Sequence, residues 1–102
     1  MIVINRKENC LTIEGHAHYD EPGKDIVCAA VSVLVQNLIQ SIEELTADKI
    51  GYVMSPGTVD IKHGNLSERA QLLVDSFFVG VNMVADEYPD NVKITGASIE
   101  SP

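Results

Sequence analysis

The chain has 102 residues, of which 45% are hydrophobic and 22% are charged, a balance typical of a single globular domain over residues 1–102. Its 7 basic and 15 acidic residues give a formal net charge of −8, which argues against nucleic acid and membranes as partners, because both attract basic proteins. The same charge permits a basic partner or a basic peptide substrate, since opposite charges speed encounter.

The first predicted element is a β-hairpin at the N-terminus. Residues 2–5 form a short apolar run, residues 6–9 form a polar turn, and residues 10–14 return with a rough alternation of apolar and polar side chains. Residues 15–24 are polar and contain a proline and a glycine. We therefore expect an irregular loop that leads into the next element.

A long helix is predicted to begin at Asp25, whose side chain is a favourable N-cap. Apolar residues follow at spacings of three and four, which indicates a stripe that faces the core: Val27, Val31, Leu34, Leu38, Ile42 and Leu45. The first half of this helix is apolar almost all the way round. Such a surface needs cover on more than one side, from a loop or from a second copy of the chain.

A second hairpin follows the helix. Residues 48–55 and 58–63 are predicted strands, and they are joined by the turn dipeptide Pro56-Gly57. This hairpin precedes a second helix, as the first one does, but residue identities do not support an internal repeat.

The second predicted helix begins after the N-cap candidate Ser67 and ends before Pro89. Its predicted core stripe consists of Leu72, Leu73, Phe77, Val81 and Val84. Residues 91–99 form the last predicted strand. The order ββαββαβ predicts an α+β fold, a two-layer sandwich in which two helices cover one face of a mainly antiparallel sheet.

Cysteine content and the N-terminus together predict a compartment. The chain has two cysteines, Cys10 and Cys28, fewer than a small disulfide-stabilised secreted domain would carry. The N-terminus becomes charged at Arg6, too early for the apolar segment of a secretion signal, and the apolar stretch 26–35 is too short to cross a bilayer. We expect a cytoplasmic protein with reduced thiols.

Cys28 is the strongest candidate for chemistry. If Asp25 caps the helix, Cys28 takes the third helical position, where backbone N–H groups and the positive end of the helix dipole favour a thiolate. The same N–H groups could hold an oxyanion at an attacked carbonyl. His16 lies in the preceding loop and could act as its base. Ser32 follows one turn later on the same helical face and could support the site.

Asp25 introduces a conflict, because a carboxylate close to Cys28 opposes thiolate formation. The conflict eases if the carboxylate oxygens of Asp25 accept hydrogen bonds from the N–H groups of the helix start. It also eases if Asp25 orients His16 as an imidazolium, as the third member of a catalytic triad does.

Simpler explanations compete with each of these roles. A cysteine in an apolar helix start can serve packing alone, and a serine in a helix can bond to its own backbone. Four potential zinc ligands are present, but they lack the usual Cys-x₂-Cys spacing: Cys10, His16, His18 and Cys28. The glycines form no phosphate-binding run. We expect neither a metal nor a cofactor.

The first helix and its preceding loop carry a specific motif: Gly15-His16-Ala17, then Gly23, then Asp25-Ile26-Val27-Cys28-Ala29-Ala30-Val31-Ser32. This motif resembles the signature of the bacterial ribosomal-processing cysteine protease family. Its specific part is a His, eleven residues, and a Cys inside Asp-Ile-Val-Cys-Ala. The resemblance covers almost the whole chain, because Leu72-Leu73, Gly80 and residues 85–89 resemble the second helix of the family and its end.

The resemblance implies an endopeptidase of the cytoplasm. Members of this family remove a short N-terminal extension from a large-subunit ribosomal protein, and they cut after a pair of phenylalanines. The resemblance implies a dyad of His16 as base and Cys28 as nucleophile, with Asp25 and Ser32 as supporting residues. It also implies a homodimer, which would cover the apolar first half of the helix.

Two rival hypotheses remain at this point. The chain could be a non-catalytic adaptor whose acidic surface binds a basic ribosomal protein tail. It could also be a thiol redox sensor that uses Cys10 and Cys28. The adaptor predicts salt-sensitive binding without a product, and the sensor predicts a disulfide or sulfenate after mild oxidation.

Overall fold

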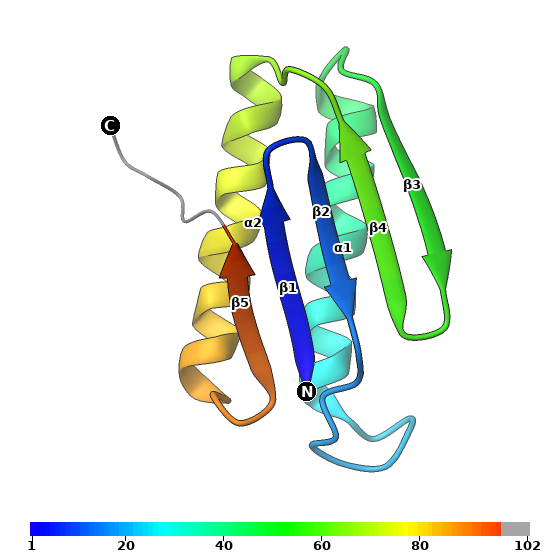
Figure 1. Ribbon diagram of the computed structural model, residues 1–102, viewed down its shortest axis with the longest axis vertical. Helices are drawn as coiled ribbons and strands as arrows, with labels where there is room; N and C mark the ends of the chain where they lie inside the picture. Colours follow the sequence, from blue (N-terminus) through cyan, green and yellow to red (C-terminus); the bar gives the residue numbers. More distant parts are fainter. Residues whose placement is uncertain (97–102) are drawn as a thin grey trace.

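Five strands and two helices follow one another in the order ββαββαβ in the computed structural model, which describes residues 1–96 (Figure 1). Their bounds are β1 Ile2–Lys7, β2 Cys10–Glu14, α1 Ile26–Leu45, β3 Ile50–Ser55, β4 Thr58–His63, α2 Glu68–Glu87 and β5 Val92–Gly96. The predicted order and both N-caps, Asp25 and Ser67, are confirmed. The part of the last predicted strand beyond Gly96 lies outside the described residues.

Strand β1 runs two residues further than the sequence predicts. Its ladder with β2 continues through Arg6, opposite Leu11, to Lys7, opposite Cys10. The Arg6 guanidinium carbon lies 4.7 Å from the centre of the Phe78 ring, and its Nη2 atom lies 3.6 Å from a carboxylate oxygen of Asp75. These contacts with α2 let a charged residue continue the strand, and the polar run 6–9 alone could not reveal them.

The five strands form one sheet in the order β3-β4-β2-β1-β5. The β1–β2, β2–β4 and β3–β4 pairs are antiparallel, whereas β1 and β5 are parallel. Both helices lie on the same face of the sheet (Figure 1). The predicted two-layer α+β sandwich with a mainly antiparallel sheet is therefore confirmed.

The core lies between the sheet and the two helices. Alternate strand residues face the helices because successive strand side chains point to opposite faces, and the buried ones are Ile2, Ile4, Leu11, Ile13, Ile61 and Val92. The helices contribute two stripes to the same cluster: Val27, Val31, Val35, Leu38, Ile39 and Ile42 from α1, and Val74, Phe77, Phe78 and Val81 from α2.

Two members of the predicted helical stripes lie outside the core. Leu72 is 68% exposed, because it lies about 200° around the helix from both Ala70 and Val74, which are buried. Leu45 is 60% exposed at the last residue of α1. The spacing of apolar residues thus predicts each helix correctly, but it assigns to the buried face some residues that are exposed.

Helix α1 is the one described helix that is long and apolar enough to cross a membrane by length and composition alone. This is weak evidence, because the core helix of a globular domain meets the same criteria. Here α1 buries one stripe in the core and leaves Ile26 and Val33 exposed on its outer side. Its apolar first half is therefore only partly covered by this chain.

Candidate active site

Asp25 fixes the start of α1 and the loop before it. Its Oδ1 atom accepts hydrogen bonds of 3.0 Å from the backbone N–H groups of Val27 and Cys28. Its Oδ2 atom accepts bonds from the backbone N–H groups of Tyr19, at 2.9 Å, and Asp20, at 3.3 Å. One carboxylate therefore caps the helix and ties the loop to it.

The charge state of Asp25 follows from these bonds. Desolvation at this half-buried position raises the pKa of Asp25, but hydrogen bonds from the N–H groups of Cys28, Tyr19, Asp20 and Val27 together outweigh it. The pKa of the Asp25 carboxyl therefore lies below its ordinary value. Of the two ways to ease the conflict with a thiolate, the structure shows the first, because the bonds of Asp25 go to the backbone.

Cys28 is half-buried at the third position of α1, and its side chain packs against the core. Its sulfur accepts a hydrogen bond from the backbone N–H of Ala17, with a nitrogen-to-sulfur distance of 3.3 Å. Ala17 is itself buried, and its carbonyl accepts a 2.9 Å bond from the side-chain amide of Asn91. The thiol is therefore held against the segment that follows His16.

His16 is exposed and lies against the turn between β3 and β4. A Cβ atom added at Gly57 would lie 3.0 Å from His16 Nε2, so the glycine leaves room for the ring. The backbone N–H of Gly15 donates a 2.8 Å bond to the carbonyl of Gly57, which ties the two segments together. Gly57, with φ +75°, also adopts a backbone conformation that suits glycine.

The predicted pair, His16 and Cys28, lines one surface cavity of about 500 Å³, together with Asp25 and His18. We call it the thiol cavity. The rings of His16 and His18 meet edge to face with 6.0 Å between their centres. An imidazole, a thiol and a capped helix start thus line one open space. A cysteine nucleophile and its base are the two groups that this kind of catalysis requires.

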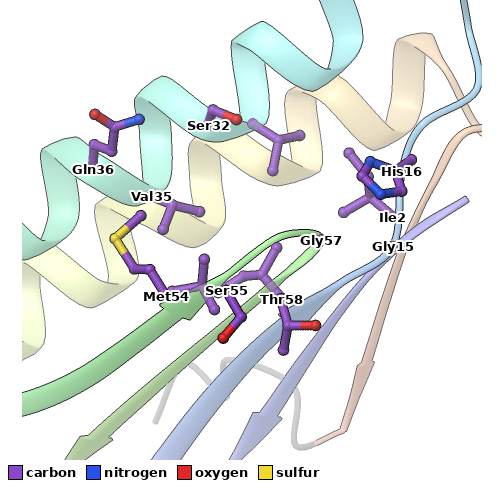
Figure 2. Close-up of a pocket in the computed structure, with 13 residues that line it drawn as sticks. Ile2, Gly15, His16, Ser32, Val35, Gln36, Met54, Ser55, Gly57 and Thr58 are labelled. Carbon is purple, nitrogen blue, oxygen red and sulfur yellow. The ribbon is translucent and has the colours of Figure 1, made fainter. Parts of the chain in front are cut away.

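Ser32 is not brought to the thiol cavity. It lies on the exposed side of α1 and lines a neighbouring pocket of about 230 Å³ between α1 and the β3–β4 hairpin, which we call the α1–β3 pocket (Figure 2). Helical spacing places Ser32 on the same face of α1 as Cys28, but the two side chains line different hollows. His16 lines both of them.

The expected oxyanion site at the helix start needs correction. The N–H groups of Val27 and Cys28 both donate to Asp25, so neither is free to bind an oxyanion while the cap is closed. The sequence predicts the cap and the free N–H groups as two separate features. The structure shows that the cap occupies two of these N–H groups, those of Val27 and Cys28.

Two alternative sites considered from the sequence are not assembled. Cys10 begins β2, at the end of the strand away from the loop that holds His16 and leads into α1 with Cys28 (Figure 1). The four residue steps from Cys10 to Glu14 span about 13 Å of strand, whereas a disulfide needs Cα atoms within about 7 Å. Among residues 1–96, no three His, Cys, Asp or Glu side chains come together in a group that could hold a metal ion.

Asn91 and Gly57 are the positioning residues that sequence reasoning missed. Asn91 precedes β5, and it joins three segments because its carbonyl also accepts a bond from the N–H of Ile2. Nothing in the local sequence distinguishes this asparagine. Gly57 is visible as a turn residue, but its proximity to His16 depends on the sheet order that places β4 beside β2.

The chain is similar to known proteins over most of its length. A family model described as Cysteine protease Prp matches residues 1–93. Two curated relatives are both named Ribosomal processing cysteine protease Prp. The one from Mycoplasma genitalium is 30% identical over 102 residues, which cover 98% of this chain and 100% of the relative. The one from Staphylococcus aureus is 29% identical over 85 residues, which cover 80% of each.

Solved structures share the fold. The Prp protease of Staphylococcus aureus in complex with a covalently linked product peptide matches with a TM-score of 0.86 and 23% identity, over 94% of this chain and 97% of that one. The protein SMU.848 from Streptococcus mutans matches with a TM-score of 0.75 and 30% identity, over 94% and 93% of the two chains.

Proposed function

This chain belongs to the Prp family of cysteine proteases, and we propose that it cuts peptides with Cys28 as nucleophile and His16 as general base and acid. The resemblance found in the sequence is thereby confirmed at the level of the family. The chain is a cysteine protease, so the alternative of a non-catalytic adaptor is wrong. The observation that carries the proposed roles is that His16 and Cys28 line the same open cavity beside a capped helix start.

The proposed reaction has two steps. His16 takes the proton of the Cys28 thiol, and the thiolate attacks the carbonyl carbon before the bond that is cut. The tetrahedral intermediate collapses, the C–N bond breaks, and His16 protonates the leaving amine. Water then attacks the thioester, His16 again acts as base, and the carboxylic acid product leaves with the thiol restored.

Ala17 and Asp25 have supporting roles in this proposal. The N–H of Ala17 donates to the sulfur and stabilises negative charge on it. Asp25 holds the loop and the helix start together through backbone bonds, so it acts as a positioning residue. Ser32 acts from the neighbouring α1–β3 pocket, where its hydroxyl can meet a bound peptide.

The proposed substrate is the N-terminal extension of a large-subunit ribosomal protein, cut after a pair of phenylalanines. Support comes from the relatives named for ribosomal processing and from the net charge of −8, which favours a basic protein as substrate. The proposed location is the cytoplasm, consistent with two free cysteines.

A homodimer is the proposed assembly. Its support is the set of large apolar side chains exposed on the outer sides of the two helices: Ile26, Val33, Leu72, Val79 and Met83. Large exposed apolar patches mark interaction surfaces in globular proteins. The molar mass in solution, measured by light scattering after gel filtration, tests this assembly.

The catalytic roles are tested with two substitutions, Cys28→Ser and His16→Ala. Each is expected to abolish cleavage of a peptide that carries the Phe-Phe extension, measured by mass spectrometry, while circular dichroism shows an unchanged fold. Cys10→Ser and His63→Ala are matched controls, because both residues lie outside the thiol cavity. Full activity of the Cys28→Ser protein would contradict the assignment of the nucleophile.

A chemical test separates an activated thiol from a merely packed one. Iodoacetamide should modify Cys28 in the folded protein at mildly acidic pH, where an ordinary thiol reacts slowly, and this reaction should slow in His16→Ala. Modification of Cys28 only after unfolding would support a packing role.

A further inference from the structure

The loop before α1 contacts the turn between α2 and β5, and both segments lie at the same end of the molecule (Figure 1). The carbonyl of Ala17 accepts the 2.9 Å bond from the side chain of Asn91. The ring of Tyr19 meets the ring of Tyr88 edge to face, with 5.2 Å between their centres. Two of the three tyrosines of the chain therefore contact each other.

The same two loop residues face the active site with their backbone N–H groups. The N–H of Ala17 donates to the Cys28 sulfur, and the N–H of Tyr19 donates to Asp25. Residues 17–19, which we call the loop clip, thus lie between the start of α1 and the α2–β5 turn. Each end of the clip has one contact on either side.

His18 joins the two ends of the clip in an uncommon backbone conformation. Among residues 1–96, it is the one non-glycine residue with a positive φ, at +55°. Its φ and ψ set the angle between the peptide group whose carbonyl faces Asn91 and the one whose N–H faces Asp25. Such a conformation costs energy and persists where surrounding contacts hold it. Here the contacts of Ala17 and Tyr19 hold it.

The α2–β5 turn gives the clip a fixed support. The carbonyl of Tyr88 accepts bonds from the N–H groups of Asn91, at 3.0 Å, and Val92, at 3.1 Å, and its side chain packs against the core. Tyr19, by contrast, is 47% exposed. The fold therefore sets the position of the Tyr88 ring, and the Tyr19 ring lies against it.

We propose that the loop clip and Tyr88 position the Cys28 sulfur for reaction by holding the N–H of Ala17 on it. This inference rests on the proposed peptidase function and adds to it the part of the fold that positions the nucleophile. Tyr19 and Tyr88 line neither the thiol cavity nor the α1–β3 pocket. Loss of their contact should therefore lower kcat and leave KM nearly unchanged, because fewer molecules hold the N–H on the sulfur while peptide binding stays the same.

The tyrosine contact is tested with Tyr19→Ala, which removes an exposed ring, and Tyr88→Leu, which removes the other ring but keeps an apolar side chain against the core. Each should lower kcat for the Phe-Phe peptide about 2- to 10-fold, the effect of losing one aromatic pair. Tyr19→Phe and Tyr88→Phe keep both rings and should restore kcat. Because the two substitutions break one contact, the double variant should lose no more than either single variant.

Iodoacetamide modification of Cys28 gives a readout that a loss of stability alone would not change. We compare the rate at about pH 6 with the rate at about pH 10, where ordinary thiols are ionised, so that changes in access to the sulfur cancel in the ratio. Both tyrosine variants should lower this ratio, because the N–H that stabilises negative charge on the sulfur is displaced. The titratable groups that line the thiol cavity with Cys28 stay the same: His16, His18, Asp20 and Asp25.

His18→Asn and His18→Val test the backbone of the clip. Both remove the imidazole, but asparagine tolerates the left-handed region and the β-branched valine does not. His18→Asn should therefore have a higher kcat and a higher rate ratio than His18→Val. Equal values in the two variants would contradict a role for the backbone at this position.

Tyr52→Ala is the matched control for Tyr19→Ala. Tyr52 is also 47% exposed, and it belongs to β3 and not to the clip. Its substitution removes an equally exposed ring and should leave the rate ratio of Cys28 unchanged. A loss as large as that of Tyr19→Ala would overturn the proposal.

The remaining outcomes separate the clip from the peptidase function. If the unmodified protein cuts the peptide but Tyr19→Ala and Tyr88→Leu keep its kcat and its rate ratio, the clip has no positioning role and the peptidase proposal stands. If the double variant loses as much as the two single losses multiplied, the tyrosines do not act through their contact and the clip is also overturned. If the unmodified protein cuts no peptide while the rate ratio still depends on both tyrosines, the peptidase proposal falls and the hold of the clip on the thiol stands.

Discussion

Asp25 joins the loop of His16 to the helix of Cys28 through four backbone hydrogen bonds. Two of them come from the first turn of α1 and two from Tyr19 and Asp20 of the loop. The carboxylate must be charged to accept all four well, and these bonds lower its pKa despite desolvation. A single ionisation therefore maintains the local geometry of the site.

This bonding predicts how stability depends on pH. Because the folded-state pKa of Asp25 lies below the ordinary value of 3.8, its stabilising effect is complete above that value and is lost as pH falls through the folded-state pKa. Asp25→Asn removes the titration. Its thermal unfolding midpoint should be lower than that of the unmodified protein at about pH 5, and the difference should shrink toward about pH 3.

Asp86→Asn is the control for Asp25→Asn. Asp86 is exposed near the end of α2, away from any helix start. Its substitution should leave the unfolding midpoint at about pH 5 nearly unchanged. A constant difference between the Asp25→Asn and unmodified proteins across the whole pH range would contradict the role given to the charge.

Gly57 determines where the ring of His16 lies, and this can be tested separately from backbone strain. Gly57→Ala places a methyl group 3.0 Å from His16 Nε2, and should displace the ring. A misplaced catalytic group reduces the rate on the order of 100-fold. Gly23→Ala is the matched control, since Gly23 also has a positive φ of +87° but nothing within 4 Å of an added Cβ.

Both glycine substitutions should lower the unfolding midpoint to a similar degree, because each forces a residue with a Cβ into the left-handed region. Only Gly57→Ala should lose most of its kcat. Equal losses of activity in the two variants would show that strain, and not the position of His16, decides the rate.

At the scale of elements, α1 and α2 pack closely because Gly80 of α2 has no side chain. A Cβ at Gly80 would lie 2.9 Å from a terminal carbon of Leu34 on α1. Helices approach closely where a small residue meets a larger one. This contact helps to hold α1, and with it Cys28, at a fixed distance from the rest of the helical layer.

The helix contact predicts coupled effects on stability. Gly80→Val overfills the contact and should lower the free energy of unfolding by about 1–3 kcal/mol, measured by urea denaturation. Leu34→Ala in the same chain should recover part of that loss, because it opens space for the new side chain. Ser76→Val, at an exposed position of α2, should have little effect. Strictly additive single and double substitutions would contradict close packing at this point.

At the scale of the whole molecule, the net charge of −8 should speed the encounter with a basic substrate. Raising the ionic strength from about 10 mM to about 100 mM shortens the Debye length from roughly 30 Å to roughly 10 Å. The kcat/KM for a Lys- and Arg-rich peptide should fall several-fold over this range. A peptide with Gln in place of these residues should be cut at a rate that salt does not change.

If salt changes kcat/KM equally for both peptides, the net charge does not speed the encounter with a basic substrate. The acidity of the chain would then serve solubility alone. Either result leaves the proposed roles of His16 and Cys28 unchanged, because the measurement compares how fast two peptides reach the protein and does not test the catalytic step.

The sequence by itself determined the order of the elements, the two N-caps, the turn at Pro56-Gly57 and the motif that joins His16 to Cys28. These features depend on residues a few positions apart, so local propensity and spacing are enough to find them. The same motif led to the family, since its His and Cys stand at a fixed distance within one contiguous segment.

Only the tertiary structure decided which helical residues are buried, how far β1 extends and which residues position the site. Leu72 is exposed and Ser32 lines a second pocket, because neighbouring elements cover only part of the surface of each helix. The spacing of apolar residues does not show where that covered part ends. Asn91 reaches Ala17 across 74 positions of sequence through the parallel pairing of β1 and β5. Such contacts arise from packing between distant segments, and no local pattern encodes them.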